Sequence, residues 1–166
     1  MATISREKVI DQWYGLVERG AGRDQWLIDK TEQLLREAKP PNVSGRREEV
    51  SSGLFGEKRN FLIVTHQRLR EFAMFINARD YGRDLDVSWY LTVNPGFFKR
   101  AISKRLAMGD ANALSMNIDV FAQQDLQAYK TIVHHCLQDA LKILMDELKQ
   151  DYSTIDRTSK GFLSVW

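Results

Sequence analysis

The stretch Leu85-Asp86-Val87-Ser88-Trp89-Tyr90-Leu91-Thr92-Val93 decides the fold class, because large apolar residues recur at every second position. A period of two places those residues on one face of a β-strand. Strands with one apolar and one wetter face are typical of antiparallel sheets that are packed on one side. The stretch therefore predicts an antiparallel sheet with a buried face.

Two more strands are predicted before it, at residues 60–66 and 69–78, where β-branched and aromatic residues are frequent. Residues 79–84 supply aspartates and a glycine for a tight hairpin. The three strands should form an antiparallel meander. A fourth strand is expected at residues 53–56 or in the apolar tail, residues 159–166.

Helices are predicted both before and after this meander in the sequence. Residues 1–39 are expected to form a helical hairpin, because Val9, Ile10, Trp13 and Val17 recur at three- and four-residue spacing before a glycine-rich break. Residues 97–108 should form a short basic helix. Residues 119–150 carry an apolar stripe over many turns and should form a long amphipathic helix across the sheet.

The expected architecture is a single α+β domain over residues 1–166. Residues 1–39 are its helical hairpin. Residues 40–53, rich in Pro, Ser, Gly and charge, form a loop or hinge. Residues 54–166 form a core of three to four antiparallel strands, the short basic helix and the long C-terminal helix.

No motif for nucleotide binding, a nucleophilic elbow or zinc binding occurs in the chain, so no catalytic residue, cofactor or metal site is predicted. In a helix His134, His135 and Cys136 point in different directions, and Cys136 should be a buried structural thiol. Asp80, Asp84 and Asp86 are better explained by turns than by a cation. One cysteine and no signal sequence favour the cytoplasm.

Charge is distributed unevenly along the chain. Residues 46–105 hold 12 Lys and Arg against 7 Asp and Glu, a net of +5, whereas residues 106–166 have a net of −3. The basic helix is a candidate surface for an anionic membrane or an acidic partner. It is equally suited to docking inside the protein. The residues of this candidate surface are Phe97, Phe98, Lys99, Arg100, Lys104 and Arg105.

Two other partners are weaker alternatives. Nucleic acid could stack on Phe61, Phe72 and Phe75, which lie among arginines in the predicted strands. A small ligand or substrate could occupy a pocket between the sheet and the long helix. The candidate wall residues of that pocket are His66, Arg70 and Tyr90.

The function predicted from these observations is a non-enzymatic binding or assembly module that acts through protein contacts. Self-association is expected, because Trp13, Tyr14, Trp26, Leu27 and Ile28 exceed what two short helices need to cover each other. The alternatives are a small ligand-binding domain or enzyme, and a peripheral membrane or nucleic-acid binder.

Overall fold

An antiparallel sheet with two helices on one of its faces is the main structure in the computed structural model, which describes residues 2–3, 9–51, 57–94 and 119–161. The sheet order is β1-β3-β4-β5-β6-β2, and the two-residue strand β1 (Ala2–Thr3) runs parallel to β3. The other five strands are antiparallel: β2 (Val9–Val17), β3 (Val43–Ser51), β4 (Lys58–His66), β5 (Phe72–Tyr81) and β6 (Asp84–Val93).

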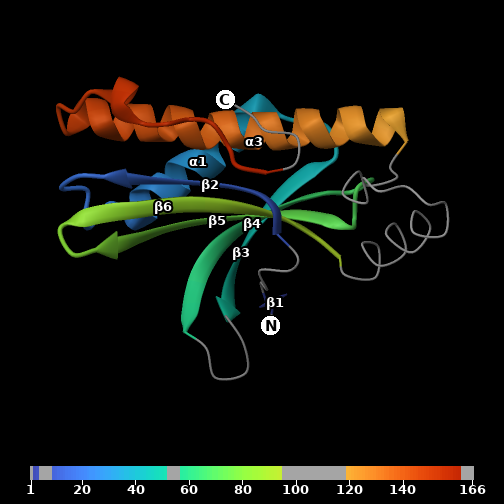
Figure 1. Ribbon diagram of the computed structural model, residues 1–166, viewed down its shortest axis with the longest axis horizontal. Helices are drawn as coiled ribbons and strands as arrows, with labels where there is room; N and C mark the ends of the chain where they lie inside the picture. The colour runs from blue at the N-terminus through green and yellow to red at the C-terminus, as the bar shows by residue number, and fades with distance from the viewer. Residues whose placement is uncertain (1, 4–8, 52–56, 95–118, 162–166) are drawn as a thin grey trace.

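The helices α1 (Asp24–Ala38) and α3 (Val120–Glu147) lie on the same side of the sheet, with a short 3-10 helix η2 (Tyr152–Thr154) after α3. Figure 1 shows α3 spanning the width of the molecule. The main core fills the space between sheet and helices. The alternation predicted for β6 is confirmed, since its buried apolar residues in this core are Leu85, Val87, Trp89, Leu91 and Val93.

The three strands of the predicted meander are β4, β5 and β6 in the structure. Phe75 of β5 is in register with Ile63 of β4 on one side and with Tyr90 of β6 on the other. Gly82 and Arg83 form the loop between β5 and β6, and Gly82 has the positive φ, 65°, that such a two-residue loop requires. The α+β class and the antiparallel sheet are therefore confirmed.

A smaller cluster lies on the opposite face of the sheet. Val50, Phe61, Ile63 and Phe75 are each less than 9% exposed there, and the rings of Phe61 and Phe75 meet edge to face. Neither described helix covers this face. Figure 1 shows the β3–β4 hairpin curving away from the helices, so the sheet is strongly bent.

The predicted N-terminal helical hairpin is wrong, because its first half is strand β2. Trp13 and Val17 point into the core, which fits a period of two as well as a helical spacing. A bulge between Val9 and Asp11 shifts the alternation and hides it in the sequence. The segment is a strand and not a helix because it pairs with β6, which puts Trp13 opposite Trp89. The second half is helix α1, as predicted.

The loop predicted at residues 40–53 is also wrong over most of its length, because Val43–Ser51 is strand β3. This strand lies near the edge of the sheet and exposes most of its side chains. Its composition is therefore polar. Residues 43–51 form a strand because they pair with β4, from Val43 opposite His66 to Ser51 opposite Lys58. The composition of the segment does not reveal this partner.

The long C-terminal helix is confirmed as α3, which begins after Asp119, whose side chain accepts a hydrogen bond from the backbone N–H of Ala122 at 2.9 Å. Neither α1 nor α3 combines the length and apolar character of a membrane span. The predicted basic helix at residues 97–108 and the predicted strand at residues 53–56 lie outside the described residues.

A buried ion pair joins α3 to β2. Lys130 Nζ lies 2.5 Å from Asp11 Oδ2, and both side chains are fully shielded from solvent. Ser159 donates its hydroxyl to the same carboxylate oxygen at 3.1 Å, and the backbone N–H of Gln12 donates to the other at 2.8 Å. The carboxylate therefore links three separate segments of the chain.

The segment after α3 returns along β2 and is held there by hydrogen bonds. Trp13 Nε1 donates to the carbonyl of Asp156 at 2.6 Å, and the N–H of Lys160 donates to the carbonyl of Gln12 at 2.8 Å. Gly161 lies so close to β2 that a Cβ would come within 2.6 Å of its backbone. Residues 159–161 thus dock on the sheet edge, and residues 162–166 lie outside the described residues.

Replacing Lys130 by Met should cost about 3–5 kcal/mol of unfolding free energy, because it leaves the Asp11 carboxylate buried without its cation. The double variant Asp11→Leu, Lys130→Met removes both charges and should lose clearly less than the sum of the two single variants. Urea unfolding of the four proteins measures this difference. Additive losses would mean that the two charges do not interact.

His134 lies one helical turn after Lys130 and is also fully buried. Its Nδ1 accepts a hydrogen bond from Trp89 Nε1 at 2.9 Å, which requires the neutral ring. Burial lowers the pKa of His134 to about 4 and outweighs the effect of the Arg157 backbone, which raises it; the positive charge of Lys130 acts in the same direction as burial. The native protein therefore keeps this histidine neutral in mild acid.

Stability should fall as the pH decreases from about 6.5 to 4, because the unfolded chain binds a proton at His134 and the folded chain does not. The loss approaches about 3 kcal/mol at pH 4. His134→Asn retains an acceptor for Trp89 and should flatten this part of the curve. His66→Asn is the control for the other buried histidine, whose pKa is also lowered by burial. Parallel curves for wild-type protein and His134→Asn would contradict the assignment.

Candidate functional site

The candidate site is a groove of about 290 Å³ between the start of α1 and the bent β3–β4 hairpin. Ile28, Leu62 and Ala78, all buried core residues, supply apolar lining from α1, β4 and β5. The volume is just below the roughly 300–1,000 Å³ of typical small-molecule sites. The other lining residues are Asp24, Gln25, Arg47, Glu48, Glu49, Asn60 and Phe61.

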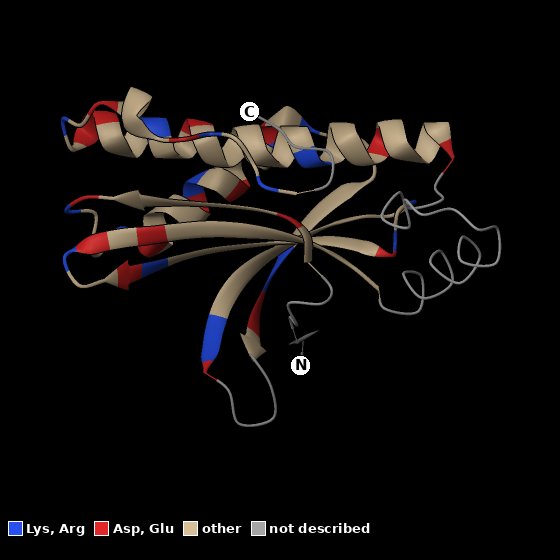
Figure 2. Cartoon of the chain, viewed as in Figure 1, with Lys and Arg blue, Asp and Glu red and all other residues tan. Residues whose placement is uncertain are grey.

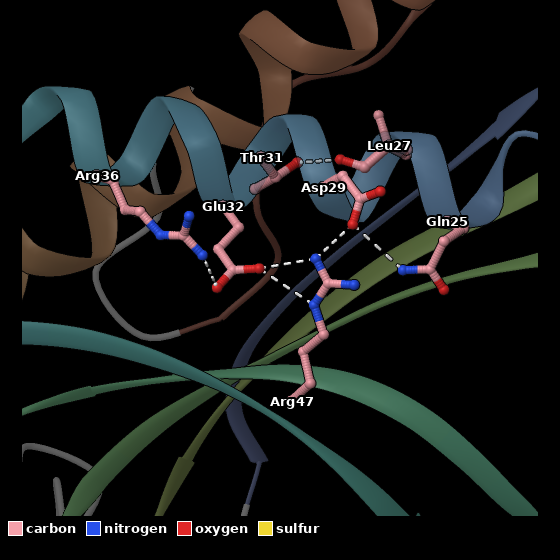
Figure 3. Close-up of polar contacts among 7 residues, drawn as sticks. All are labelled: Gln25, Leu27, Asp29, Thr31, Glu32, Arg36 and Arg47. Carbon is pink, nitrogen blue, oxygen red and sulfur yellow. Dashed lines mark hydrogen bonds and ion pairs between the residues drawn. The ribbon is translucent and has the colours of Figure 1, made fainter.

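Arg47 joins the two sides of the groove. It projects from β3 and binds two carboxylates of α1, as Figure 3 shows. Its Nη2 lies 2.5 Å from Asp29 Oδ1 and 2.7 Å from Glu32 Oε2, and its Nε lies 3.1 Å from the same Glu32 oxygen. Arg36 holds the second oxygen of Glu32 at 2.6 Å, and Gln25 donates to Asp29 at 3.3 Å.

These contacts change the protonation equilibria of the network. Hydrogen bonding to Arg47 lowers the pKa of Asp29. Partial burial opposes ionisation of Glu32, but the hydrogen bonds from Arg47 and Arg36 outweigh it and lower the pKa of that carboxyl as well. The two carboxylates raise the pKa of Arg47. Asp29, Glu32 and Arg47 are thus ionised at neutral pH, and the positive charge of Arg47 is balanced by carboxylates of the same chain.

Asp24 differs from the other acidic residues of the groove, because it is half-buried and makes no ion pair among the described residues. Glu48 and Glu49 have cationic neighbours, Arg46 at 3.1 Å and Lys58 at 3.1 Å. Figure 2 shows both signs of charge on α1 and on the β3–β4 hairpin. The groove therefore combines an apolar lining with a carboxylate that makes no ion pair among the described residues and lies in the first turn of α1, where the helix dipole favours a negative charge.

His66 is the predicted pocket residue that lies beside a cavity. That cavity holds about 110 Å³ near the start of α3 and is lined also by Asp125 and Tyr129. His66 Nδ1 accepts the N–H of Arg68 at 3.2 Å. The Tyr129 hydroxyl donates to the carbonyl of Val64 at 2.6 Å and accepts from the N–H of Met74 at 3.1 Å, so its hydrogen bonds are structural.

The other two predicted pocket residues, Arg70 and Tyr90, do not line this cavity. Arg70 is exposed in the β4–β5 connection, where its Nε donates to the carbonyl of Gln67 at 3.1 Å. Tyr90 packs against the small cluster on the face of the sheet away from the helices. The candidate surface of Phe97, Phe98, Lys99, Arg100, Lys104 and Arg105 lies outside the described residues.

Several apolar groups that suggested partner surfaces are buried. Trp13, Leu27 and Ile28 belong to the main core, so they are not surplus apolar surface for self-association. The rings of Phe61, Phe72 and Phe75, considered as a platform for bases, are at most 8% exposed.

The aspartates of the β5–β6 hairpin hold neighbouring backbone and side-chain groups. Asp84 accepts the N–H of Arg19 at 2.9 Å, and Asp80 accepts the N–H of Gly22 at 2.8 Å. No metal-binding group of His, Cys, Asp and Glu occurs among the described residues. Cys136 is buried, which raises the pKa of its thiol to about 11.

Sequence reasoning missed the Arg47 network and the buried polar residues of α3. The three-residue separation of Asp29 and Glu32 signals that both lie on one face of a helix. It does not identify the arginine that they bind, because the partner strand was itself missed. Lys130, His134 and Gln138 recur at four-residue intervals and are all buried. That spacing is visible in the sequence, but such residues normally mark a solvated face.

Comparison of the chain with models of protein families, with curated proteins and with solved structures finds no match in any of the three.

Replacing Arg47 by Met should lower the free energy of unfolding by up to about 1 kcal/mol at pH 7, because the pairs are partly exposed. The contribution needs ionised Asp29 and Glu32, whose pKa values are lowered in the folded protein. It is therefore present above about pH 4 and should vanish as the pH falls through those lowered values. Denaturant unfolding at pH 7 and pH 3 measures it. Arg46→Met is the matched control, and an equal loss in both variants at pH 7 would contradict the role of Arg47.

Proposed function

We propose that the protein is a non-enzymatic binding module that takes a segment of a partner protein into the groove between α1 and the β3–β4 hairpin. The observation that carries this proposal is the groove itself, whose apolar lining and charged rim are features of a contact surface. Its volume suits inserted side chains better than a large cofactor.

The residue types in the groove support binding over catalysis. Its lining contains no His, Cys, Ser, Thr, Tyr or Lys, so it lacks a hydroxyl, thiol or amine nucleophile and a histidine base. Other chemically versatile groups in the described residues are tied into the structure: Lys130 to Asp11, His134 to Trp89 and the hydroxyl of Tyr129 to two backbone groups.

The second candidate function is a small-ligand site at the cavity beside His66, which is favoured by a histidine and Asp125 lining one pocket. Its volume is less than half that of the groove, and Tyr129 offers it no free hydroxyl. Binding of membranes or nucleic acid through residues 97–105 stays a prediction.

Photo-crosslinking in cells tests the groove as the docking surface. A photoreactive side chain at Asn60, in the groove, should trap a defined protein, whereas one at Lys142, on the exposed face of α3, should not. The same products at both positions, or none at Asn60, would contradict the proposal.

The trapped protein is then purified and titrated against three forms of this chain. Gln25→Trp places a bulky ring at the groove and should weaken binding at least tenfold. Gln123→Trp makes the same change at an exposed position on α3 and should leave binding unchanged. Unaltered binding of Gln25→Trp would place the contact elsewhere.

A further inference from the structure

The carboxylate of Asp24 gives the groove a definite electrostatic preference. Its half-buried position shields it partly from water, and it makes no ion pair among the described residues. Arg47, the single cation of the lining, is already held by Asp29 and Glu32. An anionic ligand would have to displace these carboxylates, whereas a cationic ligand meets an unpaired one.

The apolar lining adds a requirement for an aliphatic stem. Ile28, Leu62 and Ala78 contribute from three different elements beside Asp24. Arginine and lysine side chains lay their methylene groups along apolar surfaces while their charged ends reach polar groups.

The polar neighbours of Asp24 favour arginine over lysine. Gln25 and Asn60 also line the groove, and each has an amide oxygen that can accept a hydrogen bond. A guanidinium has five N–H donors in a planar arrangement and can satisfy a carboxylate and neighbouring amide oxygens together. An ammonium group has three donors and is more strongly hydrated.

The existing ion pairs do not close the groove to a cation. In the Lys58–Glu49 pair the side chains are 55% and 49% exposed, and in the Arg46–Glu48 pair they are 58% and 31% exposed. Ion pairs at such positions are weak and are screened by salt. Glu49, which lies on the same face of β3 as Arg47, can therefore share an incoming positive charge without a large cost.

We infer that the groove recognises an arginine side chain of the partner segment, with its guanidinium on Asp24 and its methylene stem against the small exposed surfaces of Ile28 and Ala78. The inference rests on the proposed function and names the chemistry of its partner. Asp24 is then the residue that sets specificity for charge, and Arg47 keeps the second side of the groove in place.

The test uses the full chain and two capped pentapeptides of alanine and leucine that differ only at the central residue, arginine or its neutral isostere citrulline. Titration is followed by the backbone amide signals of Asp24, Ile28, Leu62 and Ala78. The arginine peptide should shift these signals saturably and bind at least tenfold more tightly than the citrulline peptide. Its affinity should fall as salt is added.

Asp24→Asn removes the charge with little change of shape and should lower the affinity for the arginine peptide at least tenfold. Asp139→Asn makes the same change on the exposed face of α3 and should have no effect. Because Asp24 lies in the first turn of α1, thermal unfolding of both variants confirms that they are folded.

Equal binding of the two peptides in the groove, or full affinity in Asp24→Asn, would overturn arginine recognition and leave the groove as a docking surface. Absence of shifts at the groove with either peptide would also overturn it. Failure of the proposed function is separate, since it requires that the crosslinker at Asn60 traps no partner.

Discussion

The buried pair of Lys130 and Asp11 is the constraint on which the arrangement of the molecule depends. A charge fully removed from water must be neutralised and hydrogen-bonded, so α3, β2 and Ser159 have to meet at one carboxylate. This fixes the long helix to the edge strand β2, while Tyr129 of the same helix reaches β4 and β5. The sheet then has one face committed to helices, and the hairpin β3–β4 at its other side is free to bend and form the groove with α1.

Two kinds of polar contact therefore have different roles in the fold. The Lys130 pair is shielded, and its strength depends on the absence of water. The Arg47 network lies at the surface, where water and salt weaken each contact, so its stability comes from several hydrogen bonds together. The buried Lys130 pair fixes the positions of α3 and β2, whereas the Arg47 network sets the distance between α1 and β3 across the groove. A binding surface next to a rigid core benefits from the second kind, because it can adjust at low cost.

The sequence predicted those elements whose periodicity is set by the core. The alternation from Leu85 to Val93 and the long stripe of α3 each bury one face, so their patterns record their structure. The sequence did not predict β2, because a bulge masks its alternation of buried and exposed residues. It also did not predict β3, because most of that strand's side chains are exposed and its composition resembles that of a loop. Of the candidate site, the groove itself was not predicted, and Ile28 and Phe61, which line it, were named only for other surfaces. The groove depends on Arg47 meeting Asp29 across 18 positions, and no local pattern encodes that contact.

The distant partners of β2 also determine the order in which the chain can assemble. The meander β4-β5-β6 joins neighbouring segments and can form as soon as they are made. Strand β2 precedes it in the chain but pairs with β6, and Asp11 is separated from Lys130 by 119 positions and from Ser159 by 148. Contacts of such separation form slowly. During synthesis β2 is thus made early and completed late, and until its partners have been made its Trp13 and Val17 are exposed to other chains, a period in which a chaperone would protect it.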